Sequence, residues 1–115
     1  LRIGDNCFIM EGNIIQPFAQ LGNDIIMWSG CHIGHDTVVD DHQFFGAHTI
    51  VSGFVHIEPN CFLGINSTIR DDIRIARETL VGAGATITKS TEERSVHVGA
   101  RPELLRITSD RLPSL

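Results

Sequence analysis

A large apolar residue returns at every sixth position of this chain, from residue 3 to residue 87. The fifteen positions are Ile3, Ile9, Ile15, Leu21, Met27, Ile33, Val39, Phe45, Val51, Ile57, Leu63, Ile69, Ile75, Val81 and Ile87. Because 42% of the residues are apolar, such a run arises by chance in one register with a frequency of about 10⁻⁶. A period of six is neither the 3.6 of an α-helix nor the 2 of a β-strand. It predicts a repeated unit of short strand plus turn, with every sixth side chain pointing into a core.

Smaller residues follow the same period. Glycine often comes directly after the apolar position, where we expect it to permit a turn; these are Gly4, Gly22, Gly34, Gly46, Gly64 and Gly82. All three cysteines fall at a second position, four residues after the apolar one: Cys7, Cys31 and Cys61. No CxxC or Cys/His metal spacing surrounds them. We interpret them as small interior fillers, and a reducing, cytoplasmic compartment fits them best.

The charge and the hydropathy of the chain limit the kinds of partner that we expect it to bind. The net charge of −5 argues against nucleic acid. No apolar stretch approaches the roughly 18 residues of a membrane helix, so we expect no membrane insertion. The charge is uneven: residues 1–69 hold one basic residue, Arg2, against seven acids, whereas residues 70–115 hold eight basic residues against seven acids. An anionic ligand is therefore expected toward the C-terminal part.

The period resembles the hexapeptide repeat of left-handed parallel β-helices, in which three hexapeptides make a triangular coil of about 18 residues. The resemblance implies an all-β helix of about five coils over residues 1–89, in which residues i and i+18 stack at about 4.8 Å. The period is lost near Ser90, so we expect residues 90–115 to form a closing strand and a short C-terminal cap. Pro102 could open a short helix there. The chain begins with what reads as the tail of an earlier repeat, so we expect a longer protein. The family resemblance implies that this protein has an N-terminal sugar-binding domain.

His35 is the candidate for proton transfer. It lies two places after the inward Ile33, where side chains should point outward, and Asp36 follows it. Gly53 stands eighteen residues later in the same column and leaves open space. An imidazole can accept and release a proton near neutral pH. The alternative is an exposed turn histidine beside a turn-forming aspartate.

Three segments carry a more specific resemblance. Ile33-Gly34-His35-Asp36-Thr37-Val38, Val51-Ser52-Gly53 and Val81-Gly82-Ala83-Gly84-Ala85 are similar to the sialic-acid O-acetyltransferase and bacterial nucleotide-amino-sugar N-acetyltransferase group, without gaps over roughly residues 1–90. The resemblance implies that His35 is the general base, Asp36 its partner, and the Gly53 N–H the donor to the thioester carbonyl. It implies that coenzyme A contacts Gly64, Ile65, Gly82 and Ala83, with its phosphates near Lys89 or Arg101, and that no metal is needed. Phe44 departs from the group, which usually has a second histidine there, and Gly99-Ala100-Arg101-Pro102 departs from its usual ending.

The implied protein is a cytoplasmic homotrimer with active sites in the grooves between subunits. It would transfer acetyl from acetyl-coenzyme A to an amino or hydroxyl group of a nucleotide-linked sugar in bacterial surface-glycan synthesis. Nothing in the sequence decides between these two groups, names the sugar, or fixes the acyl length. Trp28 and the outward Phe44, Phe54 and Phe62 are expected to pack between subunits or against a substrate. Two alternatives stay open: a non-catalytic β-helix assembly subunit, and a β-helix carbonic anhydrase, whose His-x4-His pair this sequence lacks.

Overall fold

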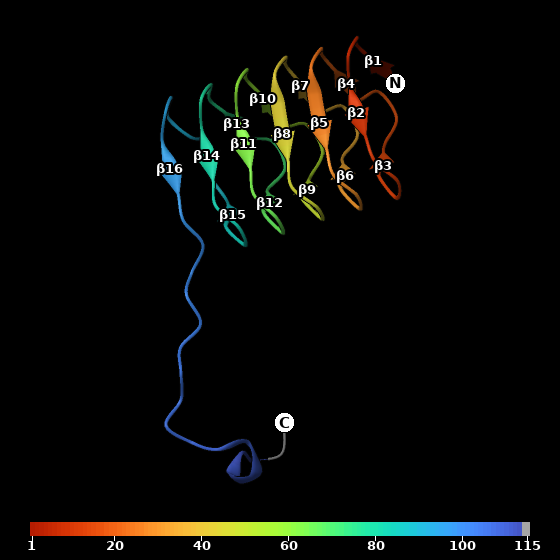
Figure 1. Ribbon diagram of the computed structural model, residues 1–115. Helices are drawn as coiled ribbons and strands as arrows, with labels where there is room; N and C mark the ends of the chain where they lie inside the picture. The colour runs from red at the N-terminus through yellow and green to blue at the C-terminus, as the bar shows by residue number, and fades with distance from the viewer. Residues whose placement is uncertain (114–115) are drawn as a thin grey trace.

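The chain folds as a left-handed parallel β-helix (Figure 1). The computed structural model describes residues 1–113; residues 114–115, the end of the predicted tail, lie outside the described residues. The strands form three parallel sheets, one on each face of a triangular prism. Sheet A contains β1 (Arg2–Ile3), β4 (Gln20–Leu21), β7 (Val38–Val39), β10 (His56–Ile57) and β13 (Arg74–Ile75). Sheet B contains β2 (Phe8–Ile9), β5 (Ile25–Met27), β8 (Gln43–Phe45), β11 (Phe62–Leu63), β14 (Leu80–Val81) and β16 (Val96–His97). Sheet C contains β3 (Ile14–Ile15), β6 (His32–Ile33), β9 (Ile50–Val51), β12 (Thr68–Ile69) and β15 (Thr86–Ile87).

The register confirms the predicted coil of three hexapeptides. Arg2 pairs with Gln20 at one end of sheet A, and Thr68 pairs with Thr86 at the far end of sheet C. The last coil differs, because Leu80 pairs with Val96 and not with Val98, which the period would place beside it. Residues of one column therefore lie directly above one another through residue 87, and the final turn is two residues short.

The predicted inward residues form the core. All of them from Leu21 to Ile87 are buried, at 5% exposure or less. Ile9 and Ile15 are only half-buried and Ile3 is exposed, because the first coil has no coil beneath it in this chain. Cys31 and Cys61 are buried in the same core as predicted, and burial raises the pKa of both thiols.

The expected reason for the glycines after the inward position was wrong. None of them has a left-handed φ; that conformation falls two places later in each hexapeptide, as at Asp24 and Asp36, both with φ of 56°. The repeat needs a small residue there because neighbouring coils approach closely. A Cβ on Gly34 would lie 2.4 Å from the carbonyl carbon of Ser52 in the next coil.

The predicted helix after Pro102 is also wrong. Residues 98–108 have no regular secondary structure, and the one helical turn that follows is a 3-10 turn, η1 (Ser109–Arg111). Figure 1 shows this tail running away from the last coil, so Leu104 and Leu105 stay exposed. A short helix needs a packing surface for its apolar face, and this one has none. Among residues 1–113, β16 is the one strand added beyond the last coil, where it extends sheet B. No helix in residues 1–113 is long and apolar enough to cross a membrane.

Candidate active site

His35 and Asp36 stand together at the prism edge between sheets C and A, where the chain turns from β6 into β7. We call this edge 1; it comprises residues 34–37 and the residues in the same columns of the other coils. The Nδ1 atom of His35 lies 2.9 Å from Oδ2 of Asp36, and the two side chains are 49% and 40% exposed. Asp36 has a left-handed φ of 56°, a conformation that aspartate tolerates. Asp36 therefore both makes the turn and holds the imidazole by its carboxylate. An Nδ1–H donated to this carboxylate leaves Nε2 of His35 free to accept a proton.

The imidazole is fixed from a second side by the next coil. A Cβ on Gly53 would lie 2.8 Å from both Cε1 and Nε2 of His35. Any side chain at position 53 would therefore clash with the imidazole ring in its present position. The Phe54 ring meets the imidazole edge-on, with centroids 5.0 Å apart. Below, the backbone N–H of His35 donates to Oε1 of Gln16 at 3.0 Å. Among residues 1–113, the Gly53 N–H donates to no protein acceptor. It is therefore free to donate to a ligand.

Two other histidine–aspartate pairs provide a comparison. Nε2 of His56 lies 2.7 Å from Asp40, and Nδ1 of His42 lies 3.2 Å from Asp24. The residues eighteen places later are Arg74 and Asn60, so neither ring has a glycine stacked above it. The His35 ring alone of these three lies directly against a glycine of the next coil. The open space expected over Gly53 is therefore occupied by the imidazole itself.

The predicted coenzyme A residues lie on a different edge. Edge 2, between sheets B and C, comprises residues 46–49 and the residues in the same columns of the other coils. An apolar groove of about 510 Å³ runs along it, lined by Trp28, Phe44, Gly46, Ala47, Phe62, Gly64, Ile65 and Ala83. The Phe44 and Phe62 rings stack flat, with centroids 4.7 Å apart and planes 3° apart. Three predicted residues, Gly64, Ile65 and Ala83, thus share the groove, whereas Gly82 lies beside it without lining it.

The two predicted phosphate ligands separate. Lys89 lies in the His35 column, three coils or about 14 Å along edge 1. Arg101 lies on the exposed tail beyond β16. The His35–Asp36 pair and the apolar groove therefore lie on different edges of one protomer, with the whole width of sheet C between them.

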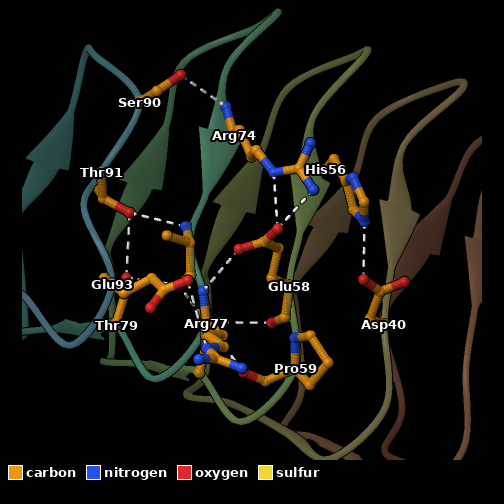
Figure 2. A network of polar contacts seen from close by, with 12 residues as sticks. Asp40, His56, Glu58, Pro59, Arg74, Arg77, Thr79, Ser90, Thr91 and Glu93 are labelled. Carbon is orange, nitrogen blue, oxygen red and sulfur yellow. Dashed lines mark hydrogen bonds and ion pairs between the residues drawn. The ribbon is translucent and has the colours of Figure 1, made fainter.

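A polar network that the sequence analysis did not single out lies on sheet A and the prism edge that follows it (Figure 2). Glu58 accepts hydrogen bonds from Nε of Arg74 at 2.8 Å and from the backbone N–H of Arg77 at 3.0 Å. The Arg74 hydrogen bond lowers the pKa of the Glu58 carboxyl. Beyond Arg74, the hydroxyls of Ser90 and Thr91 accept the backbone N–H groups of Arg74 and Ala76 at 3.0 and 2.9 Å. In the part of the chain that the structure describes, β13 is the last strand of sheet A. These hydroxyls therefore satisfy its outer donors, so this end of the network closes the coil.

The residues described contain no cluster of three His, Cys, Asp or Glu side chains placed to hold a metal ion.

Comparisons with known proteins agree with the repeat and the fold. Residues 54–89 match the family described as "Bacterial transferase hexapeptide (six repeats)". The bifunctional protein GlmU of Thermodesulfovibrio yellowstonii is 27% identical over 128 residues, covering 86% of this chain and 28% of the relative. The UDP-3-O-acylglucosamine N-acyltransferase of Rhodopseudomonas palustris is 38% identical over 86 residues, covering 73% of this chain and 22% of the relative.

The same fold occurs in the acetyltransferase domain of PglB from Neisseria gonorrhoeae. The TM-score is 0.53 and the identity 17%, over 85% of this chain and 51% of that one. This chain spans only about a quarter of the curated relatives, at 28% and 22% of their lengths. The predicted resemblance is confirmed: the chain is a hexapeptide-repeat left-handed β-helix that resembles the acyltransferases built on this repeat.

Proposed function

We propose that this chain is the acyl-transfer part of an enzyme that moves an acetyl group from acetyl-coenzyme A to an amino or hydroxyl group of a nucleotide-linked sugar. The observation that carries the proposal is the fixed imidazole of His35. Asp36 holds its Nδ1 side at 2.9 Å, and the missing side chain of Gly53 lets the ring lie against the next coil. The curated relatives support the reaction class, since one is named as an N-acyltransferase of a UDP-linked glucosamine.

The chemistry needs only this chain's own groups at the reacting centre. The acceptor nitrogen or oxygen attacks the thioester carbonyl while Nε2 of His35 removes its proton. Asp36 stabilises the imidazolium that forms, and the Gly53 N–H donates to the developing oxyanion. Collapse of the tetrahedral intermediate breaks the carbon–sulfur bond, and the imidazolium returns the proton to the thiolate. General-base assistance of this kind contributes roughly 10²–10⁴ in rate.

The divided half-sites are the reason to propose a trimer. His35 lies on edge 1, and the groove with Ile65 and Ala83 lies on edge 2. A cyclic trimer with its threefold axis parallel to the prism axis, and sheet C turned toward the threefold axis, brings edge 1 of each copy against edge 2 of the next. Coenzyme A would lie in that seam, with its phosphates toward Lys89, at the basic end of the chain. The acceptor sugar would be held by an N-terminal domain, and we place the enzyme in cytoplasmic synthesis of bacterial surface glycans.

Replacing His35 by alanine in the full-length protein tests the catalytic assignment. We expect acetyl transfer to fall at least about 100-fold while coenzyme A still binds, because the groove is on another edge. Asp36→Asn should cost less, because the base survives with a poorer partner.

His42→Ala is the matched control, since His42 is also an exposed histidine paired with an aspartate, at 3.2 Å. Near-normal turnover in the His35 variant, or a greater loss in the His42 variant, would reject the assignment and favour a non-catalytic assembly subunit.

A further inference from the structure

The apolar groove on edge 2 has two ends at different heights along the prism. A β-helix of this repeat rises one coil, about 4.8 Å, for each three hexapeptides, so residue number measures height along its axis. On this scale Trp28 lies about 2 Å below His35 and Phe44 about 2.5 Å above it, whereas Ile65 and Ala83 lie about 8 and 13 Å above. The groove therefore begins at the level of His35 and continues toward the C-terminal end.

Rotation about an axis parallel to the prism axis leaves the height of every residue along that axis unchanged. In the proposed trimer, on which this inference rests, His35 of one copy thus faces Trp28 and Phe44 at the start of its neighbour's groove. The thioester carbonyl lies beside Nε2 of His35, and the pantetheine arm leaves toward Ile65 and the basic end of the chain. The acyl group lies on the other side of the carbonyl. It therefore points toward Trp28 and Phe44.

The chemistry of this end of the groove is wholly apolar apart from the indole N–H. The Phe44 ring, stacked flat on Phe62, forms one wall, and the Trp28 side chain, 43% exposed, forms another. Between them Gly46 and Ala47 add almost no side-chain volume. We propose that Trp28 and Phe44 form an acyl-chain pocket, so that the site accepts short, straight acyl chains longer than acetyl.

Binding of coenzyme A thioesters tests the pocket without knowledge of the acceptor. Dissociation constants of coenzyme A, acetyl-, butyryl- and hexanoyl-coenzyme A are measured by calorimetry. Each methylene buried against the aromatic walls should tighten binding up to about fourfold, from about 0.8 kcal/mol per CH₂. We therefore expect butyryl-coenzyme A to bind about tenfold more tightly than acetyl-coenzyme A.

Variants assign this preference to the two walls. Phe44→Ser and Trp28→Ser should bring the butyryl-to-acetyl ratio close to one, and Phe44→Leu should keep most of the ratio. Leu80→Ala is the control, because Leu80 stands in the Phe44 column two coils higher and does not line the groove.

A ratio near one in the wild-type protein, or a ratio unchanged in both serine variants, overturns the acyl pocket alone. Failure of coenzyme A itself to bind overturns the proposed function, and the pocket with it.

Discussion

Gly53→Ala should separate catalysis from folding at the candidate site. The added methyl carbon would lie 2.8 Å from Cε1 and Nε2 of His35 and 3.2 Å from Cδ2. These atoms are the far end of a half-exposed side chain, so the ring can swing outward and leave the backbone in place. The swing loses one exposed hydrogen bond to Asp36, which is worth about 1 kcal/mol of unfolding free energy. It also removes the positioned base, so turnover should fall about 100-fold or more.

Gly34→Ala is the comparison, because its methyl group would meet backbone. Its Cβ would lie 2.4 Å from the carbonyl carbon of Ser52 and 2.5 Å from the nitrogen of Gly53. Neighbouring coils would have to part, and overpacking of this kind costs about 1–3 kcal/mol or more. Urea unfolding and single-turnover acetyl transfer on both variants give the two quantities. The reasoning is refuted if Gly53→Ala keeps normal turnover, or if it loses as much stability as Gly34→Ala.

Two further predictions follow from the shifted pKa values. Burial raises the pKa of Cys31 and Cys61, so iodoacetamide at pH 8 should label no cysteine of the folded protein other than the half-buried Cys7. A second labelled cysteine in mass spectrometry would contradict this packing. The Arg74 hydrogen bond lowers the folded-state pKa of Glu58, so its contribution is fully present above the unfolded carboxyl pKa of about 4.3 and is lost as pH falls through the lowered folded value. Glu58→Gln should therefore cost up to about 1 kcal/mol in urea unfolding at pH 7 and almost nothing near pH 2, and a cost that persists in acid would count against this ion pair.

The core and its register could be predicted from the sequence because one period decides both. Every sixth side chain points into the prism. The position of that residue within the coil of eighteen decides which of the three sheets it belongs to, and the number of the coil decides its height along the axis. The prediction weakened where the reason for a residue was local geometry. Gly34 fits the repeat whether it serves a turn or a close contact, and only the position of the Ser52 backbone shows which. The tail failed for a related reason, since the pattern of Leu104 and Leu105 suits a helix but cannot show that no surface lies beneath it.

The contact between His35 and Asp36 could be predicted, but the prediction did not place this pair and the groove on different edges. His35 and Asp36 are adjacent in sequence, and Gly53 follows at one coil, so columns suffice to find them. The sequence separation between His35 and Ile65 is not a whole number of coils, and this phase difference already places them on different edges. The Asp40–His56 pair was not predicted, because its two members lie in neighbouring outward columns and a search within one column does not find them. The two-residue shortening of the last coil has no sign in the period, which ends at Ile87.

The most direct test of a site shared between subunits is to mix two inactive variants. His35→Ala removes the base from edge 1, and Ala83→Trp fills the groove on edge 2 with a side chain at an exposed position. Each variant alone should lose acetyl transfer. In trimers reassembled from equal amounts of both, about one interface in four joins an intact His35 to an intact groove. We therefore predict recovery of about a quarter of the wild-type activity; no recovery on mixing, or full activity in a monomer, would contradict a site built from two subunits.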